Sequence, residues 1–486
     1  MLPTRTMKSA VAVAALALVV SATPSASVAA GDTPSPPSPT AACDNVSPIA
    51  IPCIVLNKAM NAVSAECRRV GIPDALCVLP LAHKVTQAAR DAYLQSWVHQ
   101  AALFQSALGD PLPLRDAQWI GTHNSFNSLE DGLTLSHLDS NQQLSMTQQL
   151  DIDVRSLELD LHWIPRLELL LKRGVTVCHG QSREQGHLGC TVEPMFRSVL
   201  PKIARWLNAP GHADEIVMLY LEDHLHDPAA YASTIATLDS VLRRPNGSSL
   251  IFRPDPAQKA ANGCVPLPLD VSRNDIRASG ARVVIVGNCA PGWSANVFDW
   301  SPAHVESGST SGYQPYPRCD TTYGDGVYET QLVRYNEDST LVSALLNPTR
   351  PPVDPDALSP EKTQAMTDCG VNLFGFDQLL PEDGRIQATL WSWAPDEPRT
   401  SVGACTVQRA SDGRWIAAPC TELHPAACLA GDTWTVTAPV TFADAAAACT
   451  AVVSTFDLPR AGDQNSALHD LAGPVGGAWV RYATSP

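Results

Sequence analysis

The sequence predicts an α/β protein whose largest part is a TIM-type (β/α)8 barrel. A helical extension is expected before the barrel, and a small disulfide-braced α+β domain after it. Two observations carry this prediction. Short apolar runs alternate with helical patterns over residues 113–390, a length close to the roughly 250 residues of typical barrels. The first apolar run is not followed by a glycine-rich phosphate fingerprint, which counts against a dinucleotide-binding fold.

Length and net charge limit the number of domains and the classes of partner that the protein can bind. The 486 residues are too many for a single compact core, so two or three domains are expected. The net charge of −16 argues against nucleic acid as a partner, because no basic surface could replace the counterions. The charge gives no help in approaching an anionic membrane, so lipid contact would have to rely on a local patch or on weak binding.

The chain begins with a pattern typical of secretion. Arg5 and Lys8 precede a short apolar run, and small residues at 27–30 suit cleavage, so residues 1–30 are expected to be a signal peptide. The run is too short to span a bilayer, and no later segment is long enough to do so. We therefore expect a secreted, extracellular protein with no transmembrane segment.

Residues 31–42 are rich in proline and serine, which indicates a linker. Apolar residues then recur at helical spacing, most clearly over 83–108, so residues 43–112 are expected to form a helical subdomain. Within the barrel region, helices are expected at 194–208 and 229–242, and further strands at 281–287 and 371–377. Residues 292–360 read as loops, and strands cannot be placed there.

The fourteen cysteines suit disulfides in an exported protein. No Cys-x-x-Cys pair occurs, so a zinc site is not expected. Connectivity stays open, but proximity in the sequence favours Cys67–Cys77, Cys178–Cys190, Cys405–Cys420 and Cys428–Cys449, with Cys43–Cys53 and Cys319–Cys369 as further candidates.

Four apolar runs, at 119–125, 154–160, 175–180 and 215–223, end on polar side chains that a core would reject. The carboxyl ends of parallel strands meet at one rim of a barrel. The residues expected to converge there are His123, Asn124, Glu158, Asp160, His179 and Glu222.

Glu158 and Asp160 are two residues apart on a strand, so their side chains share a face. Together with Glu222 and the Asn124 amide oxygen they would form an all-oxygen cluster, and its negative charges would repel one another. Such a cluster favours a calcium site, and calcium is plentiful outside the cell. The alternative is an ordinary salt-bridge network. Two histidines beside it suit the removal of one proton and the delivery of another.

The four motifs Gly-Thr-His-Asn-Ser, Arg-Ser-Leu-Glu-Leu-Asp, Cys-His-Gly and Leu-Tyr-Leu-Glu-Asp, in this order, resemble the X-domain core of phosphatidylinositol-specific phospholipase C. The resemblance implies that His123 and His179 are catalytic. It also implies calcium ligands at Asn124, Glu158, Asp160 and Glu222, as in the metal-dependent branch of the family. An arginine stands at the position of Asp160 in the metal-free bacterial branch.

The same resemblance implies a lipid substrate at a membrane surface. The inositol 2-hydroxyl would attack the phosphodiester, with His123 assisting its deprotonation and His179 protonating the departing diacylglycerol oxygen. Lysines that could hold ring phosphates are scarce, which favours an unphosphorylated headgroup. Arg183 and Arg273 are the candidates for substrate contact, and Arg277 and Arg334 are further cations.

After residue 390 helical patterns thin out, and residues 391–486 resemble a C-type-lectin-like domain with its two halves exchanged in order. This resemblance implies the bridges Cys405–Cys420 and Cys428–Cys449. The chain has Glu397-Pro398-Arg399 where sugar-binding members carry Glu-Pro-Asn. A calcium-held sugar is therefore not expected, while other glycan contact by this domain stays open.

Two alternatives remain. A glycerophosphodiesterase-like enzyme would use a similar barrel, but its His-Arg-Gly motif is absent. A barrel without activity could instead serve as a scaffold for glycan or cell-surface binding. The presence of both histidines and of the whole oxygen set favours the enzyme.

Overall fold

A computed structural model describes the part of the chain that follows residue 84. The described residues are 85–128, 130, 140–166, 169–179, 190, 193–290, 292–293, 295–306, 314–319, 330–337, 358–382 and 384–484. The expected signal peptide and linker, the Cys43–Cys53 and Cys67–Cys77 pairs, and Arg183 lie outside them. No helix within these ranges is both long enough and apolar enough to cross a membrane.

Two capped helices open the described chain. In α4 (Gln87–Leu94) the Thr86 hydroxyl accepts a hydrogen bond from the backbone N–H of Ala89, and Ser96 caps α5 (Trp97–Gly109) in the same way. Gln105 of α5 is buried, and its Oε1 accepts a hydrogen bond from the Trp391 backbone N–H at 2.9 Å. Helix α5 therefore contacts the start of the C-terminal region directly.

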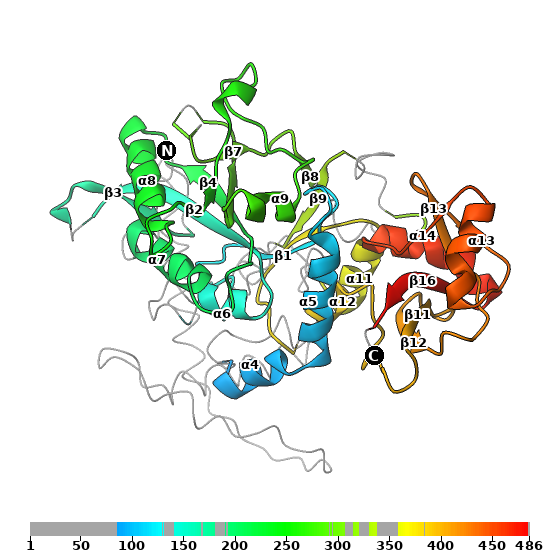
Figure 1. The fold of residues 1–486 in the computed structure, drawn as a ribbon. Coiled ribbons are helices and arrows are strands. Elements are labelled where there is room, and N and C mark those ends of the chain that lie inside the picture. Colours follow the sequence, from blue (N-terminus) through cyan, green and yellow to red (C-terminus); the bar gives the residue numbers. More distant parts are fainter. Residues whose placement is uncertain are drawn as a thin grey trace, which may run out of the picture. The chain divides into compact units, whose positions relative to one another are not determined.

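The centre of the structure is a curled, mainly parallel sheet (Figure 1). Its strands follow the order β5-β6-β4-β2-β1-β10-β9-β8, with β3 paired to β2 and β7 paired to β6. Among the described strands of this sheet, only β2 and β3 pair in the antiparallel direction. The strands are β1 (Trp119–Thr122), β2 (Ser156–Pro165), β3 (Arg173–Val177), β4 (Val217–His224), β5 (Ile251–Phe252), β6 (Val283–Gly287), β7 (Phe298–Asp299), β8 (His304–Glu306), β9 (Leu332–Asn336) and β10 (Leu373–Phe376).

The described strands thus form a curled parallel half-barrel, with β5 and β8 at the two ends of the sheet. Closure into a complete TIM barrel stays a prediction. Strands β7, β8 and β9 lie in the region that the sequence pattern could not resolve, because they are short and lie among loop-like segments. The expected strands at 281–287 and 371–377 correspond to β6 and β10.

Helices lie between many of the strands along the described chain (Figure 1). They are α6 (Met146–Asp151), α7 (Phe196–Leu207), α8 (Pro228–Val241), η4 (Pro256–Gln258), α9 (Arg273–Ala278), α11 (Pro360–Asp368) and α12 (Arg385–Ala388). The leucines of β2 show how they cover the sheet. Leu157 and Leu159 share one apolar cluster with Val199 and Ile203 of α7. Because side chains alternate along a strand, the residues between these leucines face the inside of the curled sheet.

The C-terminal region contains two three-stranded antiparallel sheets, β12-β11-β16 and β14-β13-β15. Trp391, Trp393, Trp415 and Trp434 form one buried cluster. The elements are β11 (Cys405–Gln408), β12 (Trp415–Ala418), β13 (Ala427–Ala430), β14 (Thr433–Val436), η6 (Phe442–Asp444), α13 (Ala445–Ala451), β15 (Thr455–Phe456), α14 (Gly462–Ala472), η7 (Gly473–Val475) and β16 (Ala478–Ala483). The lectin-like relationship stays a prediction.

Five disulfides are present among the described residues. Four were predicted from proximity in the sequence: Cys178–Cys190, Cys319–Cys369, Cys405–Cys420 and Cys428–Cys449. The fifth, Cys264–Cys289, joins the two cysteines that proximity had left unassigned. It connects the segment after β5 to the end of β6.

Gly121 lets β1 approach both of its neighbours. A Cβ at this position would lie 2.5 Å from the Phe374 backbone oxygen and 2.9 Å from the Ser156 Cβ. We expect Gly121→Ala to lower the free energy of unfolding by about 1–3 kcal/mol, because backbone atoms of paired strands cannot move aside. Denaturant unfolding measures the change. Gly263→Asn, at an open position with φ +84°, is the control and should stay near the parent value; equal loss in both variants would contradict the account.

Candidate active site

Three carboxylates gather on the inner face of the sheet. Glu158 and Asp160 lie on β2, and Asp160 pairs in register with Glu222 of β4. One carboxylate oxygen from each of the three lies within 4.8 Å of the others. Glu158 and Asp160 are each only 4% exposed. The structure therefore brings together the acidic residues that the strand ends predicted.

Burial makes it unfavourable for these carboxyl groups to be ionised together. It raises the pKa of Asp160 well above its usual value, and the charges of Glu222 and Glu158 raise it further. Burial also raises the pKa of Glu158, even though Arg334 acts in the opposite direction. Burial acts to raise the pKa of Glu222 as well, but hydrogen bonding and charge from His224, 2.8 Å away, lower it. The three carboxylates therefore need nearby positive charge to be ionised together.

Arg334 supplies part of the missing positive charge. Its guanidinium lies 3.2 Å from the Glu158 carboxylate and 2.9 Å from that of Glu306. The guanidinium also lies 5.1 Å from the ring centres of Tyr220 and Trp300, a distance typical of cation–π contact. The sequence had offered Arg334 only as one of several unplaced cations.

Asn124 connects the carboxylates to a histidine. It follows β1 with φ +44°, in the left-handed region that asparagine tolerates better than most residues. Its amide has two possible orientations, and only the second pairs each donor with an acceptor. In one, Nδ2 lies 3.0 Å from His123 Nε2, and Oδ1 lies 2.7 and 3.0 Å from the two Asp160 carboxylate oxygens. In the other, Nδ2 donates to Asp160 and Oδ1 accepts from His123.

The first orientation directs a fourth oxygen at the carboxylates, an arrangement that would need a shared cation. The second orientation satisfies the hydrogen bonds of the Asn124 amide with no cation present. Three carboxylates and an amide oxygen form a donor set that fits a hard cation such as calcium or magnesium. The residues present therefore fit a dication held by Asn124, Glu158, Asp160 and Glu222.

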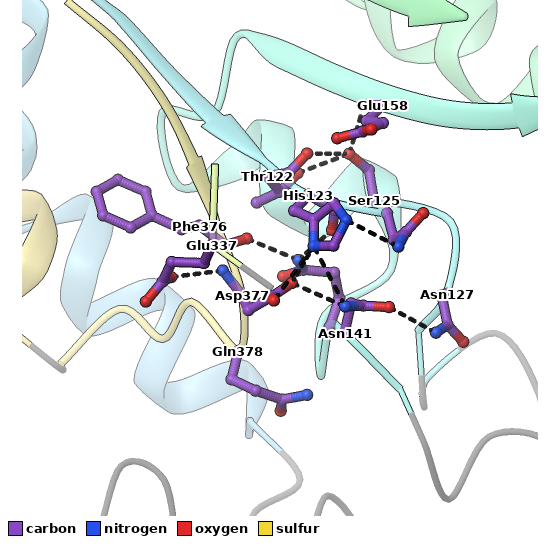
Figure 2. Close-up of polar contacts among 12 residues, drawn as sticks. Thr122, His123, Ser125, Asn127, Asn141, Glu158, Glu337, Phe376, Asp377 and Gln378 are labelled. Atoms are coloured by element: carbon purple, nitrogen blue, oxygen red, sulfur yellow. Dashed lines mark hydrogen bonds and ion pairs between the residues drawn. The ribbon is translucent and has the colours of Figure 1, made fainter. Parts of the chain in front are cut away.

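His123 is oriented by a residue that the prediction omitted. Its Nδ1 lies 3.1 and 3.2 Å from the two carboxylate oxygens of Asp377, which directly follows β10 (Figure 2). Burial acts to lower the pKa of His123, but the charges of Asp377, Glu158 and Asp160 outweigh it and raise the pKa to about 10. Asp377 has the same sequence signal as the predicted residues, a carboxylate at the end of a buried strand.

His179 follows β3 and is exposed. Its Nδ1 lies 3.3 Å from Asn127 Nδ2, which also donates to Asn141 Oδ1 at 2.8 Å. Asn141 Nδ2 in turn donates to Asp377 Oδ1 at 3.0 Å (Figure 2). A short chain of amides therefore links the two predicted catalytic histidines at one site. Neither asparagine had a signal in the sequence, because neither lies in a helix or a strand.

Arg273 does not belong to this site. It is 3% exposed at the start of α9, where its guanidinium lies 2.9 Å from the Asp110 carboxylate and donates to the Ser106 backbone oxygen at 2.7 Å. It also lies 5.2 Å from the ring centre of Trp119, the first residue of β1. The predicted substrate contact is therefore wrong: Arg273 binds elements at the opposite end of β1 from His123.

The Asp377 contact predicts a measurable change in His123. Asp377→Asn removes a negative charge next to Nδ1, so the pKa of the imidazole should fall from about 10. Titration of the His123 ring by NMR in the presence of chelator measures this. Glu382→Gln is the control, because the charges that raise the pKa of His123 come from Asp377, Glu158 and Asp160. An unchanged His123 pKa in Asp377→Asn would contradict the assignment.

With this geometry established, comparison with known proteins places the chain in a family. Residues 78–383 match the family described as "Rv2075c PI-PLC-like domain". Two uncharacterized proteins of Mycobacterium tuberculosis, MT2135 of strain CDC 1551 / Oshkosh and Rv2075c of strain ATCC 25618 / H37Rv, are each 66% identical over 484 residues, which cover 99% of both chains.

Among solved structures, the phosphatidylinositol-specific phospholipase C from Listeria monocytogenes is 15% identical with a TM-score of 0.37. The match covers 59% of this chain and 98% of that one. A calcium-dependent phosphoinositol-specific phospholipase C from Pseudomonas sp. is 12% identical with a TM-score of 0.27, over 57% and 95% of the two chains. The family match covers more than half of this protein, and the two mycobacterial relatives extend over nearly all of it. The chain therefore belongs to the Rv2075c PI-PLC-like family.

Proposed function

We propose that this protein is a phosphodiesterase that cleaves phosphatidylinositol-type lipids to diacylglycerol and a cyclic inositol phosphate. The observation that carries the proposal is the pairing of two linked histidines with an adjacent all-oxygen cluster. Membership of a family named for its likeness to phosphatidylinositol phospholipase C supports the same chemistry.

In the proposed reaction the inositol 2-hydroxyl oxygen bonds to phosphorus while the bond from phosphorus to the diacylglycerol oxygen breaks. His123 is the proposed base, with Asp377 holding the ring through Nδ1 and with Nε2 directed toward Asn124. A cation held by the carboxylates would offset the charges of Glu158 and Asp160 that raise the pKa of His123, and the imidazole could then accept the hydroxyl proton. His179, exposed after β3, delivers a proton to the leaving oxygen. Water can then open the cyclic product with the two roles reversed.

Asn124, Glu158, Asp160 and Glu222 are the residues proposed to hold calcium. Calcium held there would supply positive charge that could lower the pKa of the attacking hydroxyl and stabilise the phosphoryl oxygens. The mutual repulsion of the three clustered carboxylates supports this assignment. Arg334 offsets the charge of Glu158 from within the sheet, on the side of Tyr220 and Trp300.

The substrate and the location are proposals of the same kind. The scarcity of lysine supports an unphosphorylated inositol headgroup. The predicted leader and the five observed disulfides support action outside the cell, at a membrane surface that the protein contacts peripherally.

The direct test is the release of inositol phosphates from phosphatidylinositol vesicles by the purified chain, in calcium and in chelator. We expect release in calcium and little in chelator. Hydrolysis of glycerophosphodiesters alone would favour the glycerophosphodiesterase alternative. Absence of both activities would favour the scaffold and would contradict the proposal.

His179→Ala should reduce turnover by about 10²–10⁴-fold, the usual contribution of a general acid. Calcium binding should be unaffected, because His179 is not among the proposed ligands. Headgroup release and calorimetric titration with calcium measure the two effects. His226→Asn, an exposed histidine with φ +49°, is the matched control and should keep full activity. A fully active His179→Ala protein would remove His179 from the mechanism.

Asp160→Arg replaces a proposed ligand with a cation. We expect activity to be lost or to become independent of calcium, because the guanidinium would occupy the place of the metal. Calcium should raise the melting temperature of the parent protein by mass action but not that of the variant. If the variant keeps the parent's calcium response in both assays, Asp160 is not a ligand.

A further inference from the structure

The β2–β3 hairpin carries an exposed apolar tip. Leu170 is 89% exposed and Leu171 65% exposed, and these adjacent leucines lie at the turn between the two strands. Lys172 and Arg173 follow them and are also exposed. In Figure 1 the hairpin extends outward from the sheet near β3. Two adjacent exposed leucines followed by two cations form a local patch on a chain of net charge −16.

The leucines are held in an unfavourable backbone conformation. Leu170 has φ +53° and Leu171 φ +67°, a region that glycine adopts freely and bulky residues rarely adopt. The turn is nevertheless ordered by hydrogen bonds. The Arg166 backbone N–H donates to the Lys172 oxygen at 2.9 Å, and the Leu171 N–H donates to the Arg166 oxygen at 2.8 Å. Strain of this kind at a solvent-exposed tip points to function rather than to packing.

The hairpin is joined rigidly to the candidate active site. Its first strand carries Glu158 and Asp160, and its second leads directly to His179. Arg166 is buried and donates to the Cys190 backbone oxygen at 3.2 Å. Cys190 is bridged to Cys178, the neighbour of His179. A surface that engages the tip would therefore be held on the same side as His179.

We propose that the tip formed by Leu169–Arg173 inserts into the interfacial region of an anionic lipid bilayer and holds the active-site rim against it. Leucine side chains at the tip would enter the acyl boundary, and Lys172 and Arg173 would lie among the headgroups. A protein partner fits less well, because a two-leucine tip is too small for a stable protein interface. The inference rests on the proposed function for its choice of lipid, but docking itself needs no turnover.

The test uses the full chain and vesicles of phosphatidylcholine, with and without phosphatidylinositol. We expect co-sedimentation with the mixed vesicles and weaker binding at high salt. The double variant Leu170→Ser/Leu171→Ser should bind about tenfold more weakly or worse, because both apolar anchors are lost. The matched control is Val452→Ser/Val453→Ser, an adjacent pair that is 53% and 91% exposed and in which Val453 has φ +60°. It should bind like the parent.

Activity separates docking from chemistry. The leucine variant should lose activity on vesicles by a similar factor while it keeps turnover of a monomeric short-chain phosphatidylinositol. Parent-like binding by the leucine variant, equal loss in the valine control, or no vesicle binding by the parent would each overturn the proposal. Tip-dependent binding without hydrolysis of any inositol lipid would leave the docking surface standing and reject the proposed function.

Discussion

The structure depends on the crowding of three carboxylates on the inner face of one sheet. Glu158, Asp160 and Glu222 place oxygens within 4.8 Å of one another, and burial raises the pKa of the first two. Like charges so close in a poorly solvated interior are unfavourable without compensation. Neighbouring cations supply only part of this compensation: Arg334 lies beside Glu158, and His224 lies beside Glu222. A bound dication would complete it.

The rest of the fold serves to hold this group. The alternate residues of β2 are leucines packed with α7, so helix packing fixes the strand while its other face carries the acids. Gly121 allows the close strand spacing that places His123 beside them. The network from Asp377 through Asn141 and Asn127 then aligns both histidines without a direct contact between them. The β2–β3 hairpin extends the same strand toward the proposed membrane surface.

Much of the site could be predicted because a buried strand that ends on polar groups is visible in the sequence. His123, Asn124, Glu158, Asp160 and Glu222 were proposed in this way, and the structure places them close together, while their roles stay predictions. Asp377 was missed despite the same pattern, because its partner His123 is 254 residues away in the chain. Asn127 and Asn141 lie in irregular segments, where no periodicity marks a side chain's direction.

The remaining errors have similar causes. Arg273 looked available as a cation, but its burial and its pairing with Asp110 depend on packing between distant elements. The strands β7 and β8 escaped prediction because two or three residues give too little alternation to recognise, and the five residues of β9 were missed as well. Membership of the family and the parallel sheet agree with the predicted class of fold.

The most direct test of the central claim is to locate calcium in the protein. Crystals grown with calcium should show one strong anomalous peak about 2.3–2.6 Å from oxygens of Glu158, Asp160 and Glu222, the usual range for calcium ligands. The Asn124 amide should then present its oxygen to the ion and its nitrogen to His123. A fully ordered cluster without a peak at saturating calcium, or a peak only at a distant surface, would contradict the account.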